Sequence, residues 1–175
     1  MTTAMLRLAR PEDACALAAL KLASFRETFI EGFKIPYPPA DLEKFERASY
    51  SVDSVARELA DTAKCTWVVD RDGTLLAYAH VGPTKLPHAD ASADDGELYQ
   101  VYALRAAQGL GLGKQLLATA FAHLETTRPG PIWLGVWSGN LKAQAIYHAL
   151  GFVKVGEYQF PVGAWRDDEF IFRRD

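Results

Sequence analysis

The sequence has few cysteines and no grouping of metal-binding side chains. Of its 175 residues only two are cysteine, Cys15 and Cys65, and both lie in apolar surroundings without a C-x-x-C spacing. The four histidines show no spacing typical of metal ligands either. We therefore predict two reduced core cysteines, and neither a disulfide framework nor a metal site.

Long apolar runs, linkers and basic blocks are also missing. No stretch approaches the roughly 18 apolar residues that a membrane span requires, and Met1 to Arg7 lack the apolar core of a signal peptide. These absences predict a cytoplasmic protein without a membrane partner. A net charge of -3, spread without a Lys/Arg block, argues against a nucleic-acid partner and is compatible with a cationic small substrate. With 49% hydrophobic residues and no flexible linker, residues 1–175 are predicted to form a single domain.

What the sequence does contain is a regular alternation of strand and helix patterns. We predict strands at residues 5–9, 66–69, 75–81, 97–104, 133–137, 153–158 and 169–173. Helices are predicted from Arg10 onward, at 51–60, from about Gly113, and from Asn140 to Leu150, with residues 34–51 and 82–96 as loops. The order from Glu97 to Leu150 is β-α-β-α, which places the chain in the α/β class, with a mixed sheet and helices on both faces.

The most informative motif is the glycine-rich run from Gln108 to Lys114, which joins a predicted strand to an amphipathic helix. Gly109, Gly111 and Gly113 let backbone N–H groups approach an anion with no Cβ in the way, and the helix adds the positive end of its dipole. The spacing fits neither a Walker loop nor a dinucleotide fingerprint. The pattern Q-x-x-G-x-G therefore predicts a phosphate cradle of another kind, and it resembles the pyrophosphate loop of the GNAT superfamily of acetyl-CoA-dependent N-acetyltransferases.

A second motif supports the same resemblance. Asn140 is a good helix N-cap, Ala143 allows close approach, and Gly151 suits a left-handed C-cap. Together with Tyr147 and Phe152 these residues match the family's N-x-x-A-x-x-x-Y-x-x-x-G-F signature. The resemblance implies the GNAT fold, a central, mixed and mostly antiparallel sheet flanked by helices on both faces.

The resemblance is strongest from Glu97 to Gly156 and extends more loosely to the whole chain. The segment Phe25–Phe29 and the ending Val155–Gly163 look like the branch that includes bacterial spermidine/spermine N-acetyltransferases. That branch makes a polyamine the first candidate for the acceptor.

The resemblance also implies acetyl-CoA as co-substrate, CoA as product and no metal. In this family the pantetheine arm bonds to backbone groups of the strand before the phosphate loop, which here are those of Val101, Tyr102 and Ala103. Further cofactor contacts are expected from Gln108, Gly109, Leu110, Gly111, Leu112, Gly113, Lys114, Asn140 and Tyr147. Lys114 either adds charge to the phosphates or is an exposed helix residue.

Two catalytic residues follow from the same comparison. Tyr147 matches the motif's tyrosine and returns to the helical face of Asn140 after about two turns, so it is predicted to be the general acid that protonates the departing thiolate. The alternative is a packed aromatic beside Phe152. Glu97 matches a glutamate that in related enzymes deprotonates the amine, often through a water, and its alternative is a solvated surface charge.

The acceptor site is less well marked in the sequence. GNAT proteins commonly build one wall of it from the first two helices, so Glu27 and Glu31 are candidates for contacting an amine. The stripe of Phe25, Phe29 and Phe33 fits either a core face or a ligand wall. Asp94 and Asp95 are candidates for gathering a positively charged substrate.

The leading hypothesis is transfer of an acetyl group from acetyl-CoA to a primary amine of a small molecule. Alternative acceptors are a protein or peptide amine, a lysine side chain, an amino acid and an antibiotic. A hypothesis of another class is a non-catalytic CoA-binding sensor. The sequence leaves open a homodimer, in which the C-terminal strands could exchange between subunits.

Overall fold

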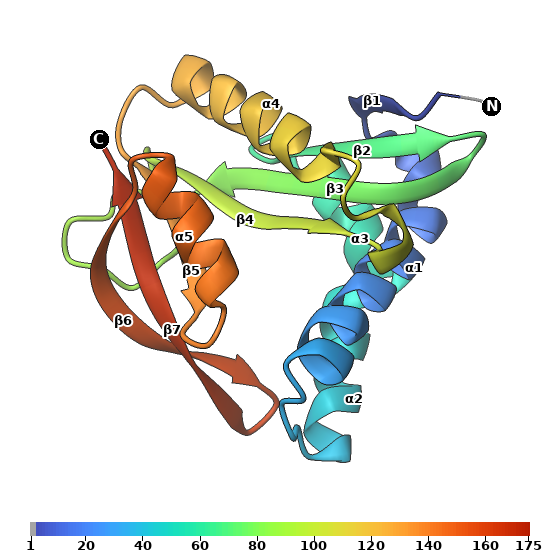
Figure 1. The fold of residues 1–175 in the computed structure, drawn as a ribbon, viewed down its shortest axis with the longest axis horizontal. Helices are drawn as coiled ribbons and strands as arrows, with labels where there is room; N and C mark the ends of the chain where they lie inside the picture. The colour runs from blue at the N-terminus through green and yellow to red at the C-terminus, as the bar shows by residue number, and fades with distance from the viewer. Residues whose placement is uncertain (1–2) are drawn as a thin grey trace.

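A computed structural model describes residues 3–175 and contains one seven-stranded sheet (Figure 1). Its strand order is β1-β2-β3-β4-β5-β7-β6, and every neighbouring pair is antiparallel except β4 and β5. The strands are β1 (Met5–Leu8), β2 (Cys65–Arg71), β3 (Thr74–Pro83), β4 (Gly96–Ala103), β5 (Ile132–Trp137), β6 (Val153–Val162) and β7 (Trp165–Arg174). The predicted mixed, mostly antiparallel α/β class is confirmed.

Helices cover both faces of the sheet (Figure 1). They are α1 (Ala14–Phe25), α2 (Pro39–Tyr50), α3 (Val52–Ala60), α4 (Leu112–Thr127) and α5 (Leu141–Ala149). Alternate residues of β2 show the division, since Val68 packs with Leu17 of α1 and Val55 of α3, whereas Val69 belongs to the core that contains Leu116 of α4. This period-two alternation gives the sheet two buried faces, with α4 on one and α1 and α3 on the other.

The prediction of a loop at residues 34–51 is wrong, because most of that segment is helix α2. Pro39 occupies its first helical position, where the missing N–H removes no helical hydrogen bond and the fixed φ favours a helix start. The prolines thus mark where the helix begins. Residues Arg26–Gly32, which extend α1, form a π-helix that carries Phe29. Phe25 of α1, Phe29 and Phe45 of α2 then pack together, with Phe25 5.2 Å from Phe29 and 5.3 Å from Phe45 between ring centroids.

The structure also differs from the sequence predictions in the burial of the cysteines and in the length of the last two strands. Cys15 is exposed on α1 and Cys65 is half-buried, so the prediction of two core cysteines is wrong for Cys15. Strands β6 and β7 are both longer than their sequence patterns suggested, and they join at a tight turn after Val162. The single seven-stranded sheet is consistent with one domain, which stays a prediction.

Two absences can be stated for the described part of the chain. None of the helices in residues 3–175 is both long and apolar enough to cross a membrane. Within the same residues, no three His, Cys, Asp or Glu side chains are grouped in a way that could hold a metal ion.

The parallel pair β4 and β5 diverges in the middle of the sheet. Pairing covers only Gly96–Leu98 of β4 and Ile132–Leu134 of β5. Beyond these residues β4 stays paired with β3 as far as Ala103, and β5 stays paired with β7 as far as Trp137. We call the unpaired region between Tyr99–Ala103 and Gly135–Trp137 the β4–β5 opening. Backbone groups that would otherwise pair across the sheet are therefore available to a ligand there.

Candidate active site

The glycine loop leads directly into the N-terminus of α4. Gly109 and Gly111 have φ angles of 81° and 76°, in the left-handed region, and Gly111 is the N-cap residue of the helix. A Cβ added at Gly109, Gly111 or Gly113 would meet no atom within 4 Å, so space for a ligand lies around the loop. The first turn of α4 contains no acidic residue that would repel an anion. The loop thus offers N–H donors and no opposing negative charge, which suits an anion such as a phosphate.

Contacts from two directions hold this loop. The Gln108 amide donates to the Ala103 carbonyl at 3.3 Å, which ties the loop to the end of β4. The Glu27 carboxylate accepts a hydrogen bond from the backbone N–H of Arg105 at 2.7 Å, and the Arg105 guanidinium lies 3.0 Å from Glu31. Lys114 is exposed on the first turn of α4.

Glu27 and Glu31 are consequently engaged at the turn before the loop, outside the cavity that is described below. Their role as substrate contacts stays a prediction, and their position gives it no support.

Tyr147 lies on α5, on the sheet face covered by α4. The helix is capped by the Asn140 side chain, which accepts a hydrogen bond from the Ala143 N–H at 3.1 Å, as the sequence predicts. Tyr147 is buried against Phe152, with ring centroids 5.9 Å apart, so packing is part of its role. Burial also raises the pKa of its phenol, which keeps the hydroxyl protonated and able to donate at neutral pH.

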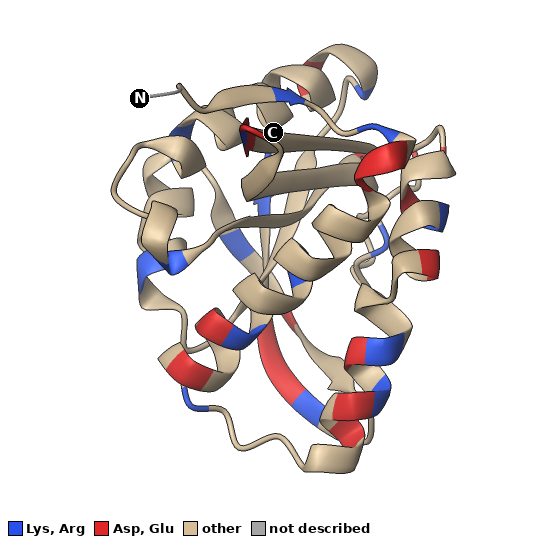
Figure 2. Ribbon diagram, turned by 90° about the vertical axis from the view of Figure 1, so that its right-hand side faces the viewer, with Lys and Arg blue, Asp and Glu red and all other residues tan. Residues whose placement is uncertain are grey.

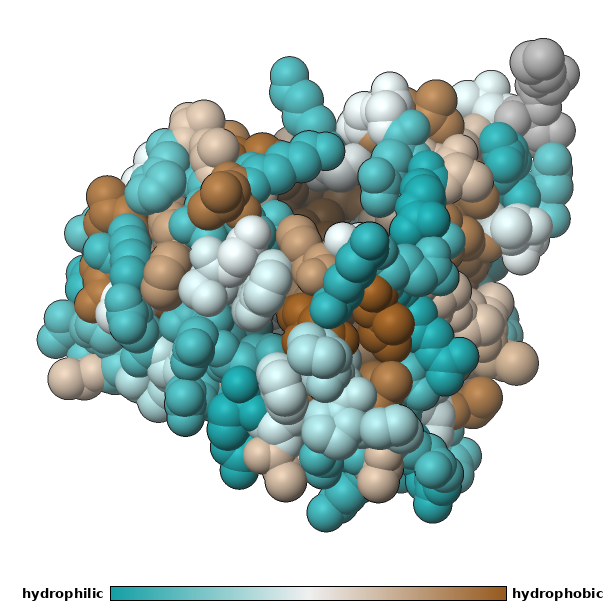
Figure 3. Space-filling model, turned by 60° about the horizontal axis from the view of Figure 1, so that its bottom comes forward, coloured by the Kyte–Doolittle hydropathy of each residue, from teal (hydrophilic) through white to brown (hydrophobic). Residues whose placement is uncertain are grey.

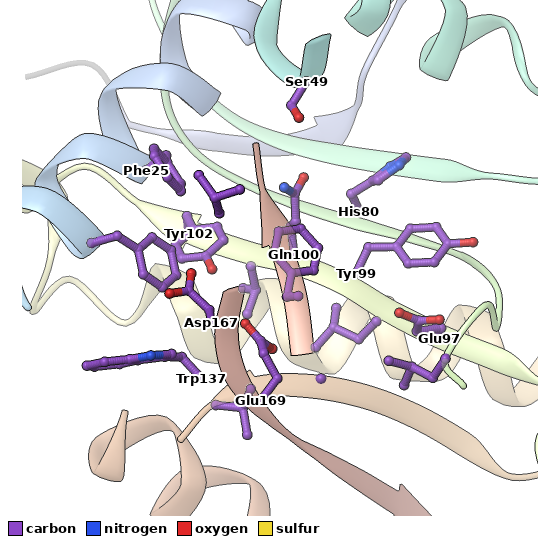
Figure 4. Close-up of a pocket in the computed structure, with 18 of the residues that line it drawn as sticks. Phe25, Ser49, His80, Glu97, Tyr99, Gln100, Tyr102, Trp137, Asp167 and Glu169 are labelled. Atoms are coloured by element: carbon purple, nitrogen blue, oxygen red, sulfur yellow. The ribbon is translucent and has the colours of Figure 1, made fainter. Parts of the chain in front are cut away.

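A cavity of about 560 Å³ lies beside the β4–β5 opening. Val101 and Tyr102 of β4, Trp137 of β5, and Asn140 and Tyr147 line the part next to the cofactor motifs. The remaining walls are rich in aromatic rings, among them Phe25, Phe29, Tyr37, Phe45, Tyr50, Tyr158 and Phe160. Figure 3 shows hydrophobic residues gathered beside a hollow on one face of the molecule, and Figure 4 shows the polar side chains that project into the cavity.

Glu97 is buried at one end of the cavity, beside Tyr99 (Figure 4). One of its carboxylate oxygens accepts two hydrogen bonds, from the Lys85 N–H at 2.8 Å and from the Thr84 hydroxyl at 3.1 Å. Burial raises the pKa of this carboxyl group, and the hydrogen bonds partly oppose that change. The reading of Glu97 as a solvated surface charge is thus wrong, and its role as base stays a prediction.

The two aspartates of the neighbouring loop do not reach the cavity. Asp95 is buried, and its carboxylate accepts hydrogen bonds from the Trp133 indole at 2.9 Å and from the Ser92 N–H at 3.1 Å. Asp94 is exposed and does not line the cavity. Asp95 therefore shapes the loop.

Three further carboxylates line the cavity, those of Glu58, Asp167 and Glu169, and none was identified from the sequence. Asp167 and Glu169 lie on β7, whose acidic stretch appears as a red segment in Figure 2. Asp167 is buried and accepts hydrogen bonds from the Tyr37 hydroxyl at 2.6 Å and the Trp165 indole at 2.8 Å. Glu169 is half-buried, and withdrawal from water together with the charge of Asp167 raises its pKa to about 7. The available signal was the acidic run Asp167 to Glu169 directly before the apolar residues Phe170 to Phe172, because residues at i and i+2 of a strand share a face.

Sequence comparisons identify a family and several relatives of the chain. The sequence model of the acetyltransferase (GNAT) family matches residues 22–152. An uncharacterized N-acetyltransferase in the pepI 3' region of Lactobacillus delbrueckii subsp. lactis is 26% identical over 87% of the chain and 88% of the relative. A mycothiol acetyltransferase from Paenarthrobacter aurescens is 38% identical, over 49% of the chain and 26% of the relative.

Solved structures share the fold. The PaiA N-acetyltransferase from Thermoplasma acidophilum, in complex with coenzyme A, superposes with a TM-score of 0.74 at 18% identity, covering 99% of each chain. The ribosomal-protein-S18-alanine N-acetyltransferase from Escherichia coli superposes with a TM-score of 0.68 at 18% identity, covering 98% of this chain and 93% of that one. At these identities the superpositions establish the fold and leave the acceptor open.

Proposed function

Because the chain belongs to the GNAT family and is an acetyl-CoA-dependent N-acetyltransferase, we propose that its acceptor is a primary amine of a small molecule, with a polyamine as first candidate. The family assignment makes acetyl-CoA the co-substrate and CoA the product. It also gives no support to the alternative of a catalytically silent CoA-binding sensor.

The observation that carries the proposal is the cavity beside the β4–β5 opening. Its volume of about 560 Å³ lies within the usual range for small-molecule sites, roughly 300–1,000 Å³. Aromatic walls favour the apolar chain of an amine and can contact a cation, while buried carboxylates supply the opposite charge. A small alkylamine meets both conditions.

The cofactor side of the proposal follows from the loop and the opening. The pyrophosphate would lie on the N–H groups of residues 108–114, and the pantetheine arm would lie against the backbone of Val101, Tyr102 and Ala103. Asn140 would border the arm from the start of α5. Bound there, acetyl-CoA supplies an activated acetyl group beside the cavity.

We assign the acid role to Tyr147, which reaches the opening from the α5 side. Its protonated phenol would give a proton to the thiolate as the C–S bond breaks. Glu97 is the base that the sequence predicts, acting through a water on the other side of the sheet. Burial raises the pKa of its carboxyl group, which makes it a stronger base than an exposed glutamate.

The experiment is a thiol-release assay with purified protein, acetyl-CoA and a panel of acceptors. The panel contains polyamines, short alkylamines, amino acids, an aminoglycoside and a peptide with a free N-terminus. The proposal predicts turnover of the small amines and little or none of the peptide. Turnover of the peptide alone would replace it with the protein-amine alternative, and no turnover of any acceptor would contradict the proposal as a whole.

A further inference from the structure

Glu169 lies at the boundary between the cavity and the β4–β5 opening. It pairs with Trp137 across β5 and β7, and its carboxylate extends over Gly135. A Cβ built on Gly135 would come 3.3 Å from the Glu169 carboxylate and 2.6 Å from the Tyr158 hydroxyl. Gly135 is the first residue of β5 beyond the paired segment. The glycine therefore leaves room for the carboxylate where the opening begins.

The hydrogen-bonding state of Glu169 differs from that of the other carboxylates in the cavity. Both oxygens of Asp167 already accept short hydrogen bonds, and one oxygen of Glu97 accepts two. Glu58, which also lines the cavity, forms an ion pair with Lys21. Glu169 accepts only one long hydrogen bond, 3.4 Å from the Tyr158 hydroxyl, among the residues that the structure describes. In Figure 4 its carboxylate points into the cavity, near Asp167 and apart from Glu97. Glu169 is thus the carboxylate with the most capacity left for a ligand.

We propose that Glu169 binds the ammonium group of the acceptor and takes the first proton from it. This inference rests on the proposed function, since it presumes an amine acceptor in the cavity. An alkylamine arrives protonated at neutral pH and cannot attack until one proton has left. A carboxylate at the boundary of the opening binds that cation and places its nitrogen next to the thioester.

The proton balance needs two acceptors on the nitrogen side. Glu169 takes one proton before the attack, and a second leaves the nitrogen once the C–N bond has formed, by the water-mediated path to Glu97. The C–S bond breaks and the sulfur receives a proton from Tyr147, which regains one from solvent. Both carboxyl groups return their protons to solvent, so one proton is released for each acetyl group transferred.

The surroundings of Glu169 suit this role. The ionisable groups that face it are Asp167 on its own strand, Tyr158 on β6, Tyr37 before α2, and Tyr102 on β4. All four are acids, and none supplies a positive charge. Burial and the charge of Asp167 raise the pKa of Glu169 to about 7, and the hydrogen bond from Tyr158 partly opposes that change. A carboxyl group with such a pKa exchanges protons readily at working pH.

The test compares Glu169→Gln with Glu97→Gln and with Glu157→Gln, an exposed site on β6. We would measure kcat and KM by thiol release from about pH 5.5 to about 9, with an alkylamine and with a hydrazide that is neutral at pH 7. Glu169→Gln should lower kcat/KM for the alkylamine by roughly 10²-fold and remove the rise in kcat/KM near pH 7. The loss should be much smaller for the hydrazide, which needs no first deprotonation. The control Glu157→Gln should match the wild type.

Two results would overturn the inference while leaving the proposed function standing. One is an alkylamine rate and pH profile in Glu169→Gln that match the wild type, and the other is an equal loss for both acceptors, which indicates a structural role. If Glu169→Gln does not fold, Gly135→Ala displaces the Tyr158 hydroxyl that donates to Glu169 and crowds the carboxylate while keeping its charge. It should raise the alkylamine KM several-fold, and an unchanged KM would also reject the inference. A wild-type protein that turns over no amine instead rejects the proposed function, and this inference with it.

Discussion

The proposed cofactor side of the site comes from one stretch of sequence, from β4 through α5, whereas the proposed acceptor side takes side chains from α1, α2, β4, β5, β6 and β7. The first depends on backbone groups: N–H donors at the glycine loop and the unpaired edges of the β4–β5 opening. The second depends on aromatic rings and carboxylates that meet only after folding. A site built from the backbone groups of one segment is marked by a local motif with fixed spacing. A site built from side chains on several strands and helices is not marked in any single segment.

The largest expected effect lies where the two sides meet. Tyr147→Phe keeps the ring and its packing against Phe152 but removes the proton donor, so kcat should fall roughly 10²-fold or more. The CoA dissociation constant, measured by calorimetry, and the melting temperature should stay almost unchanged. A well-folded variant with the wild-type kcat would show that the thiolate takes its proton from elsewhere, most simply from water.

The cofactor side alone is tested by Gly111→Val. The φ of 76° at this position is costly for a residue with a branched Cβ, so the loop must change shape. The CoA dissociation constant should rise tenfold or more, on the order of 1.4 kcal/mol, and acceptor preference should not change. Gly113→Val serves as the matched comparison for Gly111→Val. It adds the same side chain two residues later, in the first turn of α4, where the glycine has open space around it. Unchanged CoA affinity in a folded Gly111→Val protein would remove the loop from the cofactor site.

On the acceptor side, the half-buried charge of Glu169 should lower the stability of the folded protein at high pH. Its carboxyl pKa rises from 4.5 to about 7 on folding, so the native state holds the proton more tightly than the unfolded chain does. The resulting contribution to stability is fully present below about pH 4.5 and is lost as the pH rises to about 7. Glu169→Gln should therefore raise the melting temperature by a few degrees at pH 8 and have little effect at pH 5. Equal effects at both pH values would contradict the raised pKa.

Raising the salt concentration should have the smallest effect, and it should act on the KM for the acceptor. Exposed charges are screened within about 8–10 Å at moderate ionic strength, whereas buried charges are screened much less. The carboxylates that line the cavity are enclosed, so the KM for spermidine should rise only about twofold between low and high salt, and the KM for a neutral amine should not change. A rise of tenfold or more in steady-state assays would instead indicate that exposed residues such as Asp90 and Asp94 attract the substrate.

The accuracy of the sequence predictions follows the same division. The glycine loop between β4 and α4 and the Asn140 cap were predicted correctly as local structure, because glycine conformation and capping are local properties. Helix α2 was missed because its N-terminal prolines were taken to exclude a helix, when Pro39 in fact starts it. Glu169 was missed because the strand pattern was recognised only from that residue onward. Its cavity neighbours, such as Tyr37, are far away in sequence. The hydrophobic pattern of a strand also does not indicate which of its faces borders a cavity.

The most direct measurement is a crystal structure of the protein with CoA and the amine that the assay identifies. The account predicts the pyrophosphate on the N–H groups of residues 108–114 and the pantetheine arm between β4 and β5. The amine nitrogen should lie about 3 Å from the Glu169 carboxylate, on the cavity side of the β4–β5 opening. An amine bound outside the cavity, or beside Glu97 with Glu169 turned away, would contradict it.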